Sequence, residues 1–288
     1  MRRMTIAVLS AALCLGGIVH AREVVVKGSD TMLNLVQRLA EAFGTAQSDA
    51  TVSVTGGGSG VGINAIVNNE CDIANASRSI VAKEIYDARS NGVNATEFAI
   101  AIDGLSIVVN AENSVQQLTV AQVGAIYRGE VKNWKEVGGE NKKIALYGRQ
   151  PSSGTFVYMR DEVMKGDYAP AMRQMNGNAQ IVEAIKSDKS GIGYVGVGYA
   201  KGAEGISVVK VAREEGGEYV SPLDADKVNA GEYPITRALF QYTNGKPLGD
   251  TRSFIEFELG ADGKKIVEEE GFFPVTARYQ EANNANLK

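Results

Sequence analysis

The chain has 288 residues, a formal net charge of −4 and a single histidine. This acidic balance argues against a general nucleic-acid or polyanion binder, which needs a basic surface. The histidine is His20, so the rest of the chain offers no Ser-His-Asp triad and no usual zinc site. Composition therefore disfavours an enzyme, and we expect neither a cofactor nor a metal.

The first 21 residues have the pattern of a secretory signal peptide. Two arginines precede an uncharged apolar run at 6–19, and the small residue Ala21 ends the segment. Such a run is too short to span a bilayer comfortably, so we expect cleavage after Ala21 and export to the periplasm. Cys14 follows a leucine where lipid attachment needs a small residue, and we therefore expect no lipid anchor.

The remaining chain is predicted to be a soluble protein of two domains. Loss of the two arginines from the 30 basic residues leaves 28 against 34 acidic residues, a net charge of −6. Cys71 is then the only cysteine and can form no internal disulfide. The roughly 267 residues that remain fit two domains of ordinary size, each with its own core.

Strand, turn and helix recur in the first hundred residues. A β-branched run at 24–26 precedes a small polar turn and apolar residues at helical spacing over 33–43. A strand at 51–55 leads through a glycine-rich turn to a helix through 63–67, and a third strand at 71–74 leads through a serine turn to another helix. Such alternation predicts an α/β fold with much parallel pairing.

Two apolar segments are suited to cross between the domains. The run 98–109 is interrupted at Asp103, and the segment 233–242 is suited to return. We therefore predict two lobes with two crossings between them. The predicted division places 22–104 plus 237–288 in lobe 1 and 105–236 in lobe 2.

The elements of the second lobe follow the same alternation. A helix is predicted at 118–127, and a strand at 144–147 is followed by a polar turn at 148–154 and a helix at 155–164. The C-terminal part at 251–270 is predicted to be helical.

Small hydroxyl residues stand where three predicted helices begin. These residues are Thr31, Ser59 and Thr155. The first N–H groups of a helix lack internal partners and carry partial positive charge, so helix N-termini with hydroxyls favour an anion. The alternative is that each residue is an ordinary N-cap worth about 1 kcal/mol. Three such residues in one chain favour a shared anion over three separate caps. The glycines at 56–58 and Gly60 support this interpretation, because they let the backbone approach a ligand closely.

Two arginines lie beside these turns. Arg149 precedes the Ser152-Ser153-Gly154-Thr155 turn, and Arg78 follows Ser77. A guanidinium offers forked, always-charged donors that suit a tetrahedral oxyanion. The alternative for either arginine is an ion pair with a surface acid, and for Arg78 the two interpretations are equally open.

One glycine pattern is set aside. Residues 191–196 match the dinucleotide fingerprint, but no strand precedes them and further glycines disrupt a following helix. We interpret this segment as a glycine-rich strand that lines the region between the domains.

The turns resemble those of the periplasmic phosphate-binding proteins of high-affinity phosphate ABC transporters. Residues 149–156 are similar to that family's Arg-to-Ser-Gly-Thr phosphate loop, while 28–32 and 58–61 resemble its first two binding turns. The resemblance extends over essentially the whole chain after the signal peptide. Residues 127–134 and 271–275 are further landmarks of the family without an obvious ligand role.

The resemblance implies a set of ligand-binding residues with one departure. Many members have an acid after the serine of the third turn, where this chain has Arg78, and that acid accepts the ligand's proton. Asp103 or Asp30 could take the role here. The implied phosphate-binding set is Ser29, Asp30, Thr31, Met32, Ser59, Ser77, Arg78, Asp103, Arg149, Ser153, Gly154 and Thr155.

The implied fold is the two-lobed periplasmic-binding-protein fold of type II, with the ligand cleft between the lobes. The implied function is capture of inorganic phosphate and its delivery to the membrane permease subunits of an ABC transporter. The implied protein is a monomer that binds no nucleic acid. Three alternatives stay open: another tetrahedral oxyanion (sulfate, molybdate or tungstate), a secreted phosphatase, and a sensing role without transport.

Overall fold

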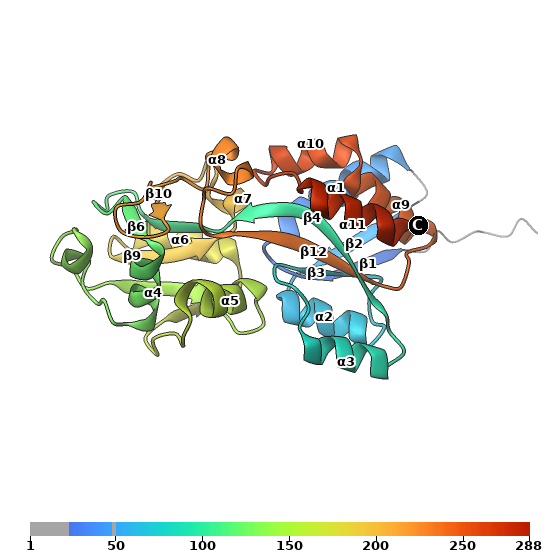
Figure 1. The fold of residues 1–288 in the computed structure, drawn as a ribbon, viewed down its shortest axis with the longest axis horizontal. Coiled ribbons are helices and arrows are strands. Elements are labelled where there is room, and N and C mark those ends of the chain that lie inside the picture. Colours follow the sequence, from blue (N-terminus) through green and yellow to red (C-terminus); the bar gives the residue numbers. More distant parts are fainter. Residues whose placement is uncertain (1–22, 48–49) are drawn as a thin grey trace, which may run out of the picture.

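The computed structural model describes residues 23–47 and 50–288. The signal-peptide prediction therefore lies outside the described residues. Strands and helices alternate along the chain and form two five-stranded sheets with a short third sheet (Figure 1). This arrangement confirms the predicted α/β class.

The first sheet has the strand order β2-β1-β3-β12-β4. Its first three strands are parallel because helices return the chain between them, whereas β12 pairs antiparallel with β3 and β4. The elements of this half up to the crossing are β1 (Val24–Gly28), α1 (Leu33–Ala46), β2 (Val52–Thr55), α2 (Ser59–Val67), β3 (Ile73–Ala76), α3 (Ala82–Ser90) and β4 (Ala95–Gly104).

The second sheet has the order β10-β5-β9-β7-β8, with β7 parallel to both of its neighbours. Its elements, with those of the short β11-β6 sheet, are β5 (Ser106–Asn110), β6 (Gln117–Thr119), α4 (Val120–Arg128), the 3-10 helix η1 (Trp134–Val137), β7 (Ala145–Arg149), α5 (Gly154–Tyr158), the π-helix η2 (Met159–Met164), β8 (Arg173–Met175), α6 (Asn178–Ser187), β9 (Gly191–Val195), α7 (Val197–Ala200), β10 (Ile206–Val208), β11 (Lys210–Ala212) and α8 (Ala225–Asn229).

Two strands connect the halves side by side. The chain leaves the first sheet at the end of β4 and enters the second sheet with β5, and β12 (Thr236–Asn244) brings it back. β12 pairs with β4 from Gly104 to Ala95, and the N–H of Leu105 donates to the carbonyl of Ile235 at 2.9 Å. The chain then ends with α9 (Gly249–Leu259), α10 (Ala261–Glu269) and α11 (Ala277–Leu287) on the first sheet's half (Figure 1).

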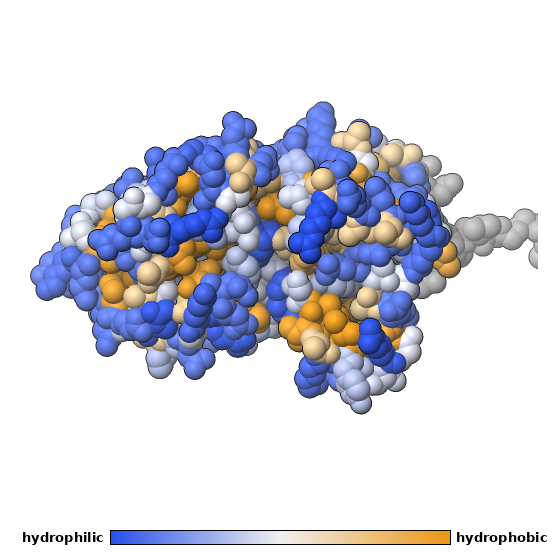
Figure 2. Space-filling model, viewed as in Figure 1, coloured by the Kyte–Doolittle hydropathy of each residue, from blue (hydrophilic) through white to orange (hydrophobic). Residues whose placement is uncertain are grey.

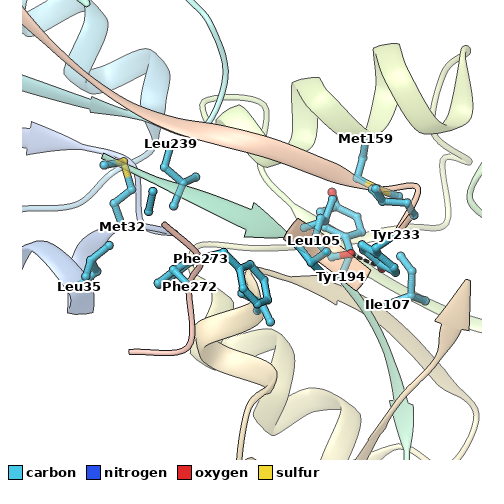
Figure 3. Close-up of a cluster of buried hydrophobic side chains, with 14 of the residues drawn as sticks. Met32, Leu35, Leu105, Ile107, Met159, Tyr194, Tyr233, Leu239, Phe272 and Phe273 are labelled. Carbon is cyan, nitrogen blue, oxygen red and sulfur yellow. Dashed lines mark hydrogen bonds between the residues drawn. The ribbon is translucent and has the colours of Figure 1, made fainter. Parts of the chain in front are cut away.

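Apolar side chains from both halves pack around these two strands. Met32 and Leu35 come from the first half, and Ile107 and Tyr194 come from the second sheet (Figure 3). All four are fully buried. The Tyr233 hydroxyl donates to the carbonyl of Leu105 at 2.7 Å and joins the two crossing segments. Both crossings therefore lie within the core, which holds their polar side chains in place.

Several predicted boundaries were wrong for local reasons. Leu118 belongs to β6, and α4 begins only at Val120 because the Thr119 hydroxyl accepts from the Gln122 N–H at 3.2 Å and the Gln122 side chain bonds back to the Thr119 N–H at 2.8 Å. The third strand lies at 73–76 instead of 71–74.

The other differences concern the ends of helices and turns. Gly148 and Arg149 extend β7 and are not in the turn. The helix predicted at 155–164 is a short α-helix that continues as a π-helix. The C-terminal helix is divided at Gly260, whose extended backbone separates α9 from α10. Residues 191–196 contribute the buried strand β9, as predicted.

Candidate anion-binding site between the two sheets

Four buried hydroxyls from separate turns meet where the two halves of the molecule face each other. Thr31 follows β1, Ser59 begins α2, Ser77 follows β3, and Thr155 lies in α5; each is at most 1% exposed. The Thr31 and Thr155 hydroxyl oxygens are 3.0 Å apart, those of Ser59 and Ser77 are 3.2 Å apart, and those of Ser77 and Thr155 are 3.5 Å apart. These four residues are called the hydroxyl cluster below.

Topology explains why the four residues meet. β1 and β3 are parallel neighbours, so the turns that follow them emerge at the same edge of the first sheet. β7 of the second sheet ends at Arg149 and leads into α5, which brings Thr155 to that edge. Three helix N-termini therefore point toward one small region, as the sequence predicted.

The hydroxyl cluster is not a set of ordinary helix caps. α1 and α2 have no side-chain cap hydrogen bond. The cap of α5 is Ser153, whose Oγ accepts from the N–H groups of Thr155 at 3.2 Å and Phe156 at 3.4 Å. The hydroxyls of Thr31, Ser59 and Thr155 therefore contact other members of the hydroxyl cluster and cap none of the three helices.

Arg149 is fully buried and contacts Asp30, the residue that precedes Thr31 of the hydroxyl cluster. Its Nη2 forms an ion pair with Asp30 Oδ2 and donates to the carbonyl of Asn176 at 2.8 Å. The other carboxylate oxygen of Asp30 accepts from the N–H of Gly57 at 2.7 Å. Among the described residues, the buried Nη1 of Arg149 has no hydrogen-bond partner. A buried cationic donor of this kind is costly unless a ligand uses it.

A second buried arginine, Arg237, was missed in the sequence. Its Nε and Nη2 donate to Asp103 Oδ2 at 3.1 and 2.8 Å, its Nη1 donates to the carbonyl of Ser77 at 2.9 Å, and its Nη2 also donates to the Thr155 hydroxyl at 2.9 Å. Asp103 is completely buried, and its Oδ1 accepts from the Val197 N–H at 2.9 Å. Arg237 thus connects both crossings to the hydroxyl cluster.

A sequence signal for Arg237 existed. Asp103 and Arg237 are lone charged residues in the two apolar crossing segments, and they are direct partners in the β4–β12 register. An unpaired charge in such a strand is expensive, so two opposite charges in neighbouring strands are expected to pair. Recognition of this pair requires the register of two strands that are more than a hundred residues apart.

The formal charges around the hydroxyl cluster cancel. Arg149 is balanced by Asp30 and Arg237 by Asp103, so an anion there would be met by hydroxyls, N–H groups and helix N-termini in addition to the guanidinium groups. Burial raises the pKa of Tyr199 to about 12. Its phenol therefore stays protonated and donates to the carbonyl of Asp30 at 2.8 Å.

The remaining predicted residues take different positions. Ser29 is buried, and its Oγ has no hydrogen-bond partner in the described part of the chain. Met32 is fully buried and directly precedes α1. Gly154 approaches the cluster so closely that an added Cβ would lie 2.4 Å from Ser59 Oγ and 2.8 Å from Ser77 Oγ.

Arg78 is not brought into the hydroxyl cluster. Its Nη1 and Nη2 bind the two oxygens of Glu84 at 2.9 and 2.7 Å, which fixes the guanidinium on the first lobe's α3. Of the two interpretations of Arg78, the structure therefore has the ion pair with an acid. Burial acts to raise the pKa of the Glu84 carboxyl, but the hydrogen bonds that it accepts from Arg78 and from the Val81 N–H outweigh this effect. The pKa of Glu84 is therefore lowered.

Backbone and side-chain contacts hold the two halves together beside the cluster. The N–H of Gly60 donates to the carbonyl of Ser152 at 2.9 Å, and the Ser152 hydroxyl donates to the carbonyl of Gly57 at 3.0 Å. An added Cβ on Gly58 would lie 2.6 Å from the Ser152 carbonyl oxygen. The glycine-rich turn therefore allows the Arg149–Thr155 loop to approach its backbone directly.

The described residues contain neither a cluster of metal-ligating side chains nor a membrane-spanning helix. Within residues 23–47 and 50–288, no group of three or more His, Cys, Asp or Glu side chains is placed to hold a metal ion. None of the helices described is both long enough and apolar enough to cross a membrane.

Comparison with known proteins identifies the family. A PBP superfamily domain matches residues 19–262. The phosphate-binding protein PstS of Staphylococcus aureus is 32% identical over 268 residues, which cover 91% of this chain and 81% of that protein. The chain therefore belongs to the PBP superfamily and, within it, to the family of the phosphate-binding proteins.

Solved structures agree with this assignment. A crystal structure of a substrate-binding protein from Clostridium perfringens, attributed to a phosphate ABC transporter and containing bound phosphate, has a TM-score of 0.78 and 26% identity, covering 88% of this chain and 100% of that one. An ABC-type phosphate transport receptor from Vibrio cholerae has a TM-score of 0.69 and 26% identity over the same shares. The predicted two-lobed periplasmic-binding-protein fold is thereby confirmed.

Proposed function

We propose that this protein binds inorganic phosphate at the hydroxyl cluster and delivers it to the permease of an ABC transporter. The relatives support this proposal because they are named as phosphate-binding and phosphate-transport proteins. The observation that carries it is the convergence of four buried hydroxyls and two buried arginines, supplied by both sheets, on one region.

The donors are sufficient for tight binding. A micromolar dissociation constant requires about 8 kcal/mol, and charge-assisted hydrogen bonds contribute roughly 1.5–3 kcal/mol each before ordering costs. The Nη1 of Arg149 and the four hydroxyls of the cluster supply five donor groups, which is about the number of bonds needed. No metal is required.

Selectivity for phosphate over sulfate needs a hydrogen-bond acceptor in the site. Singly protonated phosphate can donate a hydrogen bond, whereas sulfate at neutral pH cannot, and a fixed buried carboxylate therefore rejects sulfate. Asp30 and Asp103 are the carboxylates paired with the two buried arginines. We propose that one of them accepts the proton of phosphate, because Arg78 is engaged by Glu84 and no acid follows Ser77.

The predicted residue roles are proposed accordingly. Thr31, Ser59, Ser77 and Thr155 would donate hydrogen bonds from their hydroxyls, and so would Ser29, whose Oγ has no partner among the described residues. Arg149 would supply the principal charge, and Met32, Ser153 and Gly154 would complete the binding turns. We propose the division into lobe 1 at 22–104 plus 237–288 and lobe 2 at 105–236, joined where β4 meets β5 and where β12 begins. We also propose that the protein is monomeric, periplasmic and not an enzyme; its relatives include a phosphate-binding protein and a phosphate transport receptor.

Calorimetric titration of the protein with phosphate, sulfate and molybdate, at about pH 6 and about pH 8, tests this proposal. Phosphate is expected to bind most tightly at both values, and Arg149→Ala is expected to lower its affinity about a hundredfold, because two or more charge-assisted bonds are lost. Asp30→Asn and Asp103→Asn separate the two candidate acceptors, since only the true acceptor should admit sulfate when neutralised. A preference of the unmodified protein for sulfate would overturn the proposal.

A further inference from the structure

A second pocket lies in the half of the molecule that contains the second sheet, away from the hydroxyl cluster. It has a volume of about 480 Å³ and lies between the end of α4, the hairpin around η1 and the start of β7. Ile126, Ile144 and Leu146 form part of its apolar wall, and all three are buried. None of the residues of the hydroxyl cluster lines it.

Side chains of one charge line the same pocket. Lys132, Lys143 and Arg173 are its charged lining residues, and all three are exposed. Within the described ranges, neither lysine forms an ion pair, whereas Arg173 approaches Asp188 at 3.9 Å and donates to the Tyr147 hydroxyl. The pocket has no acidic lining residue, so the charged part of its lining is cationic beside an apolar wall.

We propose that this pocket binds a small organic anion that has an apolar body, such as an aliphatic carboxylate. Ligand pockets are typically 300–1,000 Å³, mostly apolar, with a few polar groups that orient the ligand. An apolar chain would cover Ile126, Ile144 and Leu146, and its carboxylate would face the uncompensated lysines.

The shape of the site favours a small molecule over a membrane surface. Apolar surface is visible on the same half of the molecule between hydrophilic ridges (Figure 2), but the pocket residues form a hollow rather than a protruding face. A bilayer surface is engaged by protruding apolar side chains, whereas a hollow accepts an inserted group. The cationic lining therefore suits an anionic ligand that enters the pocket.

The test uses decanoate and the fluorescent anion anilinonaphthalene sulfonate as probes on the full chain. Both are expected to bind saturably, to compete with each other and to bind more weakly at high salt, because the lysines are exposed. The double variant Lys132→Glu/Lys143→Glu is expected to lower decanoate affinity at least tenfold. Lys265→Glu, at an exposed lysine remote from the pocket lining, is the matched control and should have no effect.

Two further measurements keep the outcome decisive. Circular dichroism and the thermal midpoint establish that the charge-reversed protein is folded, and phosphate titration establishes that its hydroxyl cluster still works. The proposal is overturned if the probes do not bind saturably, if phosphate displaces them, if charge reversal leaves decanoate affinity unchanged, or if the protein binds anionic phospholipid vesicles but not decanoate.

Discussion

The polar residues of the candidate site are arranged as two buried ion pairs that share the hydroxyl cluster. Asp30 orients Arg149 from the first turn, and Asp103 orients Arg237 from the neighbouring crossing strand. A buried pair contributes little net stability, but removal of one partner leaves the other charge uncompensated. We infer that these pairs are present to hold the guanidinium groups in place.

The Arg237–Asp103 pair can be tested by a double-mutant cycle. Arg237→Gln leaves Asp103 fully buried with Val197 N–H as its remaining donor, so the free energy of unfolding should fall by about 3–5 kcal/mol. Arg237→Gln combined with Asp103→Asn should lose less than the sum of the single changes, since no charge is left unpaired. Urea unfolding measures all four proteins, and additive losses would show that the two side chains are not coupled.

Gly154 tests how closely the start of α5 approaches the site. In Gly154→Ala the added Cβ would enter the space of the buried Ser59 and Ser77 hydroxyls, so the change should overpack the site and lower the free energy of unfolding by about 1–3 kcal/mol. We also expect at least a tenfold loss of phosphate affinity in this variant. Gly177→Ala, where an added Cβ meets nothing within 4 Å, is the control. Equal affinities of the two variants would argue that Gly154 does not face the ligand.

At the scale of elements, the sequence predicted the parts of the site that are local. The hydroxyls at helix starts and the position of Arg149 beside them follow from short stretches of chain. The Arg237–Asp103 contact depends on the register of β12 against β4, which no local pattern contains. For the same reason the start of α4 was misplaced: Leu118 continues an apolar helical pattern, but Thr119 and Gln122 form a capping box after a strand.

A buried polar chain links α9 to the strand that precedes Ser77. Gln241 on β12 donates to Glu258 Oε1 at 3.0 Å and to Asn75 Oδ1 at 3.1 Å. Complete burial raises the pKa of Glu258 well above its usual value near 4.5, so this carboxyl keeps its proton to a higher pH in the folded protein than in the unfolded chain. The adjacent Asn75 carbonyl accepts from the N–H of Ser29, which connects the chain to the first binding turn.

This chain of residues predicts a pH dependence of stability. Because the folded pKa of Glu258 is raised, the folded state binds the proton more tightly than the unfolded state, and stability falls as pH rises above about 4.5 toward the folded pKa. Glu258→Gln keeps an uncharged group of the same shape and should remove that loss. Its advantage in urea midpoint over the unmodified protein should widen between about pH 5 and about pH 8. An advantage that does not change with pH would contradict a protonated Glu258.

At the scale of the whole molecule, the two halves are joined by the two crossing strands and by contacts at the site. The crossing strands pair along their length, while Gly60 to Ser152 and Tyr199 to Asp30 bridge the opposed surfaces. Each of these two bridges is a single hydrogen bond worth about 0.5–1.5 kcal/mol, and the Arg149–Asp30 ion pair and the Thr31–Thr155 hydroxyl contact also join the two halves. A bound anion that contacts both halves would add to the free energy that holds them together.

A crystal structure of the protein grown with phosphate tests this account most directly. We predict one tetrahedral anion within hydrogen-bond distance of Arg149 Nη1 and of hydroxyls from both halves, Thr31 or Ser59 on one side and Thr155 on the other. The account would be contradicted if phosphate bound at another place while Arg149 and the hydroxyl cluster kept the contacts described here.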